Sequence, residues 1–318
     1  MHRLLHTIFP EQASNFAPQV DYLFFALLAL CSAVTLLVFA AILFFCVRYR
    51  RGSQVDRGPR KFSSLRFEIS WTVIPFFIFL GLFFWAADVF FGMSRPPANA
   101  TEIYVVGKQW MWKIQHPDGR REINALHIPV GQPVKLIMTS QDVIHDFFIP
   151  GFRTKQDVVP GRYTTEWFTP TRPGQYHLFC SQYCGMDHSK MIGTIYVMEP
   201  AEHARWLAEQ PAPDSLVAIG ERSFHTRGCS GCHAPNAALR APLLDGIYGK
   251  KIPLADSTLV TADEEYLRDS ILLPNKQIAA GYEAIMPTFQ GQISEEELNA
   301  IIAYLKSLGA SNGNGERP

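Results

Sequence analysis

Two long apolar segments near the start of the chain contrast with the mixed pattern of everything that follows. Tyr22 to Val47 is an uncharged run of 26 residues, about 39 Å as an α-helix, and the hydrocarbon core of a bilayer is about 30 Å thick. A second uncharged run of 19 residues extends from Ile69 to Ala87, and a membrane helix tolerates Pro75 within it. The pattern predicts a transmembrane hairpin over residues 21–92 with spans at about 22–47 and 69–87, after an N-terminal segment, 1–20.

Basic residues dominate the connection between the two apolar runs. Asp56 is the only acidic residue there before Glu68. The basic residues are Arg48, Arg50, Arg51, Arg57, Arg60, Lys61 and Arg66. The positive-inside rule therefore predicts a cytoplasmic loop, with both termini and the soluble domains on the outer side. A signal peptide is the alternative, but the first run begins after residue 20 and is followed by arginines instead of a small-residue cleavage site.

A different pattern, of short strands separated by turn residues, occupies residues 100–199. Pro-Gly and Gly-containing turns separate the apolar stretches, and no helix-period segment of useful length intervenes. The predicted strands are Glu102 to Val106, Trp110 to Gln115, Val134 to Thr139, Val143 to Ile149, Tyr163 to Phe168, Gln175 to Phe179 and Thr194 to Met198. They predict an all-β, cupredoxin-like sandwich or barrel.

Helical spacing returns after residue 199. A short helix over Ala201 to Gln210 and the stiff Pro211-Ala-Pro213 form a predicted linker, 200–213. Residues 214–311 predict an all-α domain, in which Thr261-Ala-Asp-Glu264 and Ser294-Glu-Glu-Glu297 are capping boxes that open helices. The remaining residues, 312–318, predict a flexible tail.

Composition adds two constraints. The 29 basic and 29 acidic residues balance, which gives no sign of a nucleic-acid partner. Of the six cysteines, Cys31 and Cys46 fall within the first apolar run, and two closely spaced pairs account for the rest.

The first of these pairs lies in a cluster of metal-binding side chains. Cys180, Cys184, His188 and Met191 fall within twelve residues, and His145 lies upstream in a predicted strand. Two cysteines on one loop can bridge two coppers, with a histidine on each and weaker axial ligands. A disulfide between the cysteines is the alternative in an oxidising compartment, and the nearby histidine and methionine disfavour it. The cluster predicts a dinuclear copper site.

The second pair has the spacing of c-type haem attachment. Cys229-Ser-Gly-Cys232-His233 would supply two thioether bonds and a proximal imidazole. Met286 is the only methionine after His233 and is therefore the predicted sixth ligand if that ligand is a methionine. His225 is the competing histidine, but it lies too close to the attachment cysteines to reach the far haem face. The chain is thus predicted to hold two redox centres, copper and one covalent haem c.

The hairpin, the copper cluster and the aromatic run Gln109-Trp-Met-Trp112 together resemble subunit II of haem-copper cytochrome c oxidases, in the form with a fused C-terminal cytochrome c domain. The resemblance covers Tyr22 to Leu308. It implies that Cys180 and Cys184 bridge the coppers of a CuA centre, with His145 and His188 as terminal imidazoles. It also implies Met191, in preference to Met186, as the weak thioether ligand.

Several further roles follow from the resemblance alone. It implies the backbone carbonyl of Gln182 as a copper ligand, although the family usually has Glu there, which puts a magnesium contact shared with the catalytic subunit in doubt. Trp110 would be the site of electron entry, against an ordinary core or interfacial aromatic. Glu68 would feed a proton channel of the catalytic subunit, against an acid at headgroup level.

Three more inferences concern residues around the two centres. Pro242, in Ala241-Pro-Leu-Leu-Asp-Gly246, would fix the proximal imidazole through its carbonyl. The family contact between the first and last haem-domain helices would involve Gly220, Phe224 and Tyr304. The remaining histidines of the β-rich part, His116, His127 and His177, are interpreted as structural or surface residues.

The expected function is that of an electron-transfer subunit of a proton-pumping terminal oxidase in a bacterial inner membrane. Electrons would pass from haem c to the dicopper centre and on to the oxygen-reducing catalytic subunit; no oxygen site is expected on this chain. Expected partners are that subunit, other oxidase subunits, membrane lipid and an external donor such as a cytochrome c or another small redox protein. Alternatives are the electron-input subunit of a copper-containing nitric oxide reductase and a free-standing membrane-anchored carrier. A quinol oxidase subunit is disfavoured because such subunits lose the copper ligands.

Overall fold

The structure is a computed structural model that describes residues 9–56, 58, 65–209, 214–234, 237 and 241–310. The chain divides into two compact units, one of residues 15–95 and one of residues 1–14 with 96–318. The predicted tail, 312–318, lies outside the described residues, as do Arg57, Arg60 and Lys61 of the basic loop.

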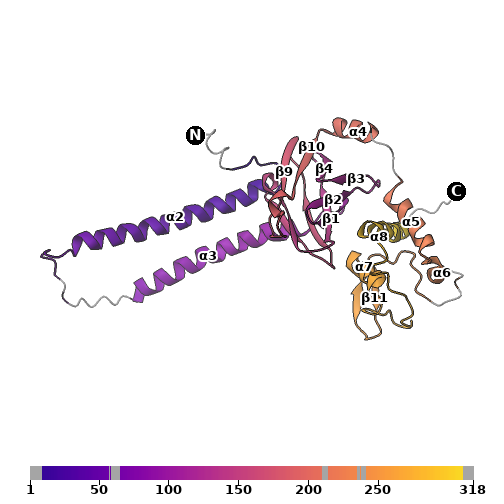
Figure 1. Ribbon diagram of the computed structural model, residues 1–318. Coiled ribbons are helices and arrows are strands. Elements are labelled where there is room, and N and C mark those ends of the chain that lie inside the picture. The colour runs from indigo at the N-terminus through magenta and orange to yellow at the C-terminus, as the bar shows by residue number, and fades with distance from the viewer. Residues whose placement is uncertain are drawn as a thin grey trace. The chain divides into compact units, whose positions relative to one another are not determined.

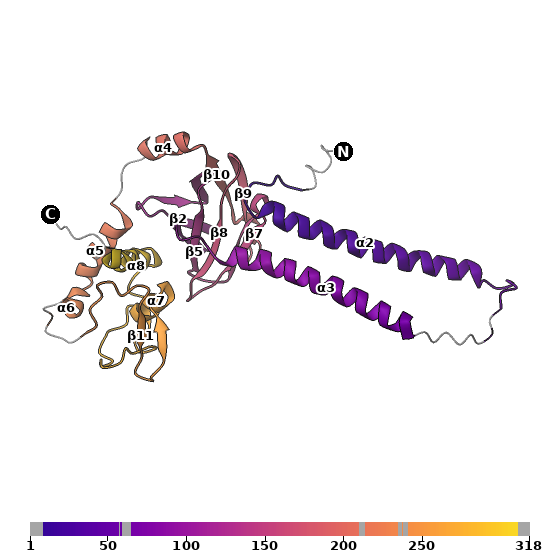
Figure 2. The ribbon, with the colours of Figure 1, turned by 180° about the vertical axis from the view of Figure 1, so that it is seen from behind.

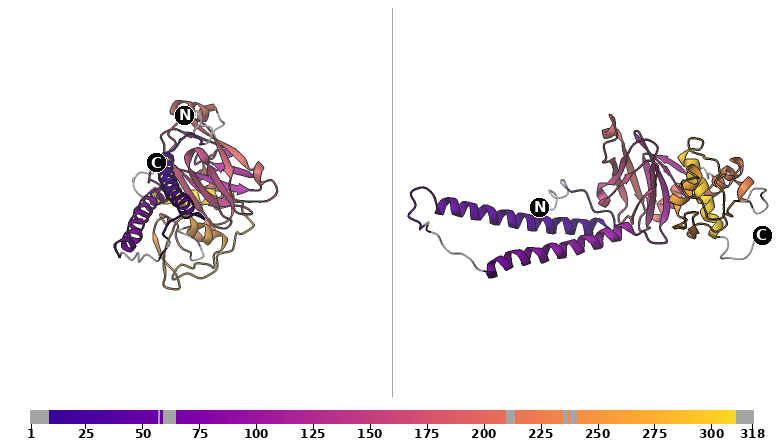
Figure 3. Two further views of the ribbon diagram at one scale, coloured as in Figure 1. Left: turned by 90° about the vertical axis from the view of Figure 1, so that its left-hand side faces the viewer. Right: turned by 90° about the horizontal axis from the view of Figure 1, so that it is seen from below.

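The first unit is a hairpin of two long helices, α2 (Ala17–Arg48) and α3 (Leu65–Ser94), which run antiparallel (Figures 1 and 3). Both are apolar around their whole circumference, and most of their large apolar side chains are exposed. By length and composition, both helices can cross a membrane. They contain the two predicted spans and extend beyond them, and Pro75 lies inside α3 as predicted.

The β-rich part is a sandwich of two five-stranded sheets, as predicted (Figure 3). The first sheet has the order β3-β2-β1-β5-β8, and the second has the order β4-β10-β9-β6-β7. The bounds are β1 Thr101–Lys108, β2 Met111–Gln115, β3 Arg121–Ile123, β4 Ala125–Pro129, β5 Val134–Ser140, β6 His145–Ile149, β7 Thr154–Val158, β8 Thr164–Phe168, β9 Gly174–Cys180 and β10 Ile192–Met198. Parallel pairing of β1 with β5 and of β10 with β4 joins strands distant in sequence, which gives the cupredoxin-like topology.

Three strands, β3, β4 and β7, were absent from the sequence-based prediction. β3 and β7 lie at sheet edges, where one side of the strand has no partner strand. Their sequences, Arg-Glu-Ile and Thr-Lys-Gln-Asp-Val, are short or polar and carry little strand signal. They are strands because they pair with β2 and β6, and pairing of that kind is decided by the fold and not by local preference.

Glu166 on β8 is a buried acid inside this sandwich. Neither carboxylate oxygen has a hydrogen-bond partner among the described residues. Burial raises the pKa of Glu166 from 4.5 to about 8, despite the nearby Thr154 hydroxyl. The folded chain therefore keeps this proton up to about pH 8, whereas the unfolded chain releases it near pH 4.5.

The Glu166→Gln variant is expected to be more stable than the parent at neutral pH. The cost of keeping Glu166 protonated grows as pH rises from 4.5 to 8, so we expect a gain of about 2–3 kcal/mol near pH 7. Denaturant unfolding of the full chain, followed by tryptophan fluorescence at several pH values, measures it. The gain must disappear near pH 4, where both side chains are neutral; an equal gain at both pH values would contradict this explanation.

The C-terminal part is helical, as predicted, with one small addition. Its helices are α4 (Pro200–Glu209), α5 (Leu216–Thr226), α6 (Ser230–His233), α7 (Glu264–Leu272) and α8 (Glu295–Ala310). A two-stranded hairpin of β11 (Lys251–Pro253) and β12 (Leu259–Thr261) lies before α7 and was not predicted. The Ser294 hydroxyl caps α8 as predicted, whereas α7 is capped by Asp263 in place of Thr261. Asp263 precedes the first helical residue, and its side chain accepts from the Tyr266 amide.

Helices α5 and α8 cross in close contact, as the family resemblance implied for the first and last helices of the haem domain. A Cβ on Gly220 would lie 1.9 Å from the carbonyl oxygen of Ala300, so only glycine permits this approach. The rings of Phe224 and Tyr304 pack beside it with centroids 5.5 Å apart.

The outer face of the first sheet packs against this helical part (Figure 2). Tyr104, Ile137 and Tyr163 belong to the same buried cluster as residues of α5, α7 and α8. Polar contacts surround that cluster: the Tyr163 hydroxyl donates to Asn299, and Lys306 pairs with both Glu102 and Glu264. Strands β1 and β5 are consequently buried on both faces, where a free sandwich would expose one.

Candidate metal and haem sites

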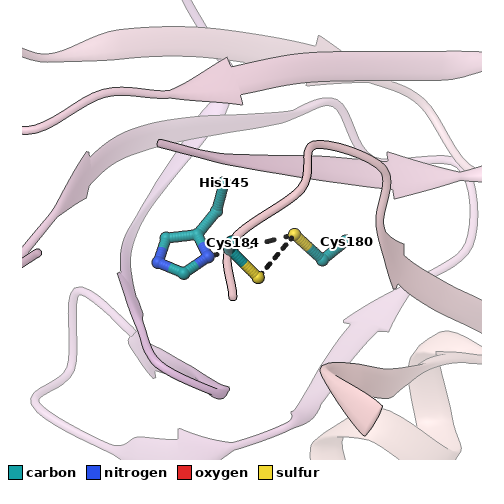
Figure 4. Close-up of side chains that lie close together, drawn as sticks. All are labelled: His145, Cys180 and Cys184. Carbon is teal, nitrogen blue, oxygen red and sulfur yellow. Dashed lines mark hydrogen bonds between the residues drawn. The ribbon is translucent and has the colours of Figure 1, made fainter. Parts of the chain in front are cut away.

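The predicted copper-binding residues converge at one end of the sandwich. The loop between β9 and β10 carries four of the six, and His145 reaches it from the start of β6, as Figure 4 shows for His145, Cys180 and Cys184. The loop lies where it was predicted. Strand pairing explains the approach of His145, because β6 pairs with β9 and brings Phe147 opposite Cys180.

The donor atoms lie within a few ångströms of one another. The two cysteine sulfurs are 3.7 Å apart. The Nδ1 atom of His145 is 3.9 Å from the Cys180 sulfur, and the Nδ1 atom of His188 is 3.4 Å from the Cys184 sulfur. The Met191 sulfur is 3.9 Å from the Cys184 sulfur. The Gln182 carbonyl oxygen is 3.2 Å from the Cys180 sulfur. All six predicted donors therefore face one small volume.

Burial separates the two candidate methionines. Met191 is completely buried beside Cys184, whereas Met186 is 93 % exposed on the surface of the loop. The thioether that faces the cysteines is thus that of Met191. Both cysteines are free thiols in the structure.

Electrostatics at the cysteine pair favour a cation. Burial raises the pKa of Cys180, but hydrogen bonds with His145 and nearby backbone groups outweigh it and lower that pKa to about 7. Burial and the adjacent Cys180 raise the pKa of Cys184 to about 12. Two buried thiolates this close repel each other, and a bound cation removes that cost. The soft sulfur and imidazole donor set fits copper.

Two residues that the sequence analysis did not assign to the site also contact it. The Asp142 carboxylate accepts a hydrogen bond from Nε2 of His145 at 2.8 Å, and the Gln109 side chain donates to the Cys184 carbonyl at 2.8 Å. An acidic residue three positions before a predicted metal-binding histidine was the available signal for Asp142.

Trp110 lies directly against the loop of residues 181–191 between β9 and β10, called the copper loop from here on. Its indole Nε1 donates to the Cys184 carbonyl at 3.2 Å, and its side chain is half-buried. Trp110 is therefore partly exposed and also contacts the copper loop, unlike an aromatic residue buried in the core.

The haem-attachment residues line one cavity in the helical part. Cys229, Cys232 and His233 are brought together by the single turn of α6, and Met286 lines the same cavity from a segment far along the chain. Most of its other lining is apolar, with Leu244, Ile247, Tyr266, Leu267, Ile271 and Phe289 among it. Such a cavity fits the apolar faces of a haem, with sulfur attachment at one edge.

The imidazole of His233 is oriented by the backbone. Its Nδ1 donates to the Pro242 carbonyl at 2.8 Å, the contact inferred for Pro242, which leaves Nε2 available to a metal. His225, the competing histidine, is exposed at the end of α5 and is not among the residues that line the cavity.

Four further residues were singled out in the sequence. Glu68 is exposed in the first turn of α3, in the hairpin unit. His116 and His127 both hydrogen-bond the buried carboxylate of Glu122, and His177 is exposed on β9. These histidines have the structural and surface positions that were predicted.

Comparisons with known proteins agree with this architecture in three successive segments. The family described as cytochrome C oxidase subunit II, transmembrane domain, matches residues 3–88, and its periplasmic domain matches residues 120–198. The family described as cytochrome c matches residues 217–309.

Individual proteins show the same relationship. Cytochrome c oxidase subunit 2 of Thermostichus vulcanus is 30 % identical over 70 % of this chain and 85 % of its own length. That of Alkalihalophilus pseudofirmus is 29 % identical over 86 % of this chain and 83 % of its own. The solved periplasmic domain of subunit II (CoxB) of Bradyrhizobium japonicum is 31 % identical over 36 % of this chain and 95 % of its own, with a TM-score of 0.35. The chain belongs to the family of cytochrome c oxidase subunit II, as a membrane protein that carries an additional cytochrome c domain.

Proposed function

We propose that this chain is the electron-transfer subunit of a proton-pumping terminal oxidase, which passes electrons from a covalently attached haem c to a dinuclear copper centre and on to the oxygen-reducing catalytic subunit. Membership of subunit II places the chain in an oxidoreductase complex with other oxidase subunits. The added cytochrome c domain supports electron entry through this same chain.

The observation that carries the proposal is the convergence of six donors at the end of the sandwich. Cys180 and Cys184 would bridge two coppers, His145 and His188 would each bind one, and Met191 and the Gln182 carbonyl would complete the set. Bound there, the coppers would supply reversible one-electron exchange. The protein holds the donors on paired strands and on a loop whose Cys184 and Met191 are buried, so little of the site needs to move when charge changes.

For the haem, Cys229 and Cys232 would form the covalent attachments, and His233 and Met286, which line the same cavity, would be its ligands. The Pro242 carbonyl holds the His233 ring. The division into a hairpin, a copper domain, a linker and a haem domain follows the ranges predicted above.

Trp110 and Glu68 would serve transfer of electrons and protons, and Gln182 bears on the contact with the catalytic subunit. Trp110 would pass electrons inward, because it is partly exposed to solvent and hydrogen-bonds the Cys184 carbonyl in the copper loop. Gln182 keeps the ligand carbonyl but lacks the carboxylate for an intersubunit magnesium. Glu68, at the cytoplasmic end of α3 by the positive-inside argument, would feed a proton channel of the catalytic subunit. The soluble domains would then face the periplasm of a bacterial inner membrane.

Metal and haem analysis of the purified assembly, with electron paramagnetic resonance, tests the proposal. We expect two coppers with a shared unpaired electron and one covalent haem c per chain, together with oxygen uptake driven by a small redox protein. A mononuclear copper signal would contradict the site. Turnover of nitric oxide in place of oxygen would favour the reductase alternative, and purification without a catalytic partner would favour a free-standing carrier.

Replacement of Met286 by leucine tests the haem ligand. Leucine has nearly the same volume but no donor sulfur, so we expect covalent haem to remain while its reduction potential falls, since a methionine ligand raises it. Redox titration of the haem absorption band measures this. A matched Met186→Leu variant should titrate like the parent because Met186 is exposed on the copper loop. An unchanged potential in Met286→Leu would show that another group binds the haem.

A further inference from the structure

The carboxylate of Asp142 lies at a junction of three backbone segments beside the copper site. Its Oδ1 accepts hydrogen bonds from Nε2 of His145 at 2.8 Å and from the Val143 amide at 2.7 Å. Its Oδ2 accepts from the Gln109 amide at 2.7 Å. One side chain thus joins the turn before β6, the ligand histidine at the start of β6, and the turn between β1 and β2.

The first consequence concerns the ring of His145. When the ring is neutral and Nε2 donates to Asp142, the nitrogen that faces Cys180 is an unprotonated Nδ1, the form that can bind a metal. The ring is fully buried and packs edge-on against Trp112, with centroids 5.9 Å apart. A Cβ on Gly107 would lie 2.9 Å from the ring, so the pocket is closed on that side too. Asp142 supplies the polar contact that selects one orientation in this pocket.

The second consequence concerns the segment of Trp110. The Gln109 amide is held by Asp142, while the Gln109 side chain and the Trp110 indole both donate to the Cys184 carbonyl, at 2.8 and 3.2 Å. The Asp142 carboxylate therefore contacts the proposed ligand His145 and also the Gln109–Trp110 segment. That segment in turn hydrogen-bonds the carbonyl of a second proposed ligand, Cys184.

We propose that Asp142 is a positioning residue for electron transfer: it sets the tautomer and orientation of His145 and holds Gln109 and Trp110 against the copper loop. The inference rests on the proposed function, because it assigns a role to Asp142 only if His145 binds copper. A carboxylate beside a ligand imidazole makes that imidazole more basic and stabilises the oxidised metal.

The variant Asp142→Asn tests this in the full chain within its assembly, with Asp187→Asn as a matched control. Asp187 carries the same charge and lies in the loop between β9 and β10, but pairs with the exposed Lys190. We expect Asp142→Asn to keep two coppers, raise the reduction potential of the centre, alter its paramagnetic resonance spectrum and slow electron transfer from haem to copper. Asp187→Asn should match the parent in all four. Asp142→Ala, which removes every contact, should weaken copper binding by about 10–100-fold.

Two outcomes overturn the inference. One is an Asp142→Asn variant whose potential, spectrum and transfer rate equal those of Asp187→Asn. The other is an Asp142→Ala variant that binds copper as tightly as the parent. Failure of the proposed function is recognised separately, because the unaltered chain would then show no dinuclear copper signal.

Discussion

Replacing Cys184 with serine is expected to abolish the dinuclear copper centre. The Cys184 sulfur faces three other donors: the Cys180 sulfur, His188 Nδ1 and the Met191 thioether. Serine is a poor ligand for Cu(I) and cannot bridge two coppers as a thiolate does. Because loss of a residue that merely supports a ligand costs about 10–100-fold, we expect loss of this ligand to lower oxygen uptake by more than about 100-fold.

Rapid mixing with a reduced donor distinguishes a failure at copper from a general failure of the assembly. In Cys184→Ser the haem should still be reduced by the donor but should not be reoxidised by oxygen. The control is Cys46→Ser in α2, a free cysteine in a membrane-spanning helix, which should leave both phases unchanged. Full copper content and normal reoxidation in Cys184→Ser would refute the assignment of the copper loop.

Substitution of Gly220 by alanine is expected to have the largest effect on stability. The added Cβ would meet the Ala300 carbonyl at 1.9 Å, and a backbone atom in a helix cannot move aside as a flexible side chain can. Overpacking costs about 1–3 kcal/mol, and a contact with main chain places this change at the upper end. For the haem domain, such a loss lowers the melting temperature by roughly 10–20 °C.

Thermal unfolding followed at the haem absorption band measures this effect. Glu221→Ala is the matched control, because it lies on the same helix with an exposed side chain and should melt like the parent. The α5–α8 crossing would be wrongly placed if Gly220→Ala melted at the same temperature as Glu221→Ala.

Most of the proposed copper and haem ligands could be named from the sequence because they lie on short segments. Cys180 to Met191 spans a single loop and Cys229 to His233 a single turn, so ligand types and spacing specify them without knowledge of the fold. The two apolar runs were equally plain, since the length and apolarity needed to cross a bilayer are properties of consecutive residues. Met286 was found only by elimination, as the last methionine of the chain.

Other features depend on contacts between distant segments. The edge strand β7 carries a polar sequence and exists because it pairs with β6. Glu166 has the appearance of a surface acid in an alternating strand, yet the sandwich encloses it. Tyr104, Ile137 and Tyr163 are buried because the helical part covers the outer face of their sheet.

Asp142 shows most clearly the difference between features predicted from local sequence and features that depend on the fold. Chain-local patterns of hydrophobicity and ligand spacing are sufficient to predict two membrane-crossing helices, a β-rich domain with a copper site and a helical domain with a haem. The burial of Met191, the exposure of Met186, the contacts of Asp142 with His145 and Gln109, and the packing of the helical part on one sheet come from the folded structure. Those arrangements depend on pairing and packing between residues far apart in the chain, which no local pattern records.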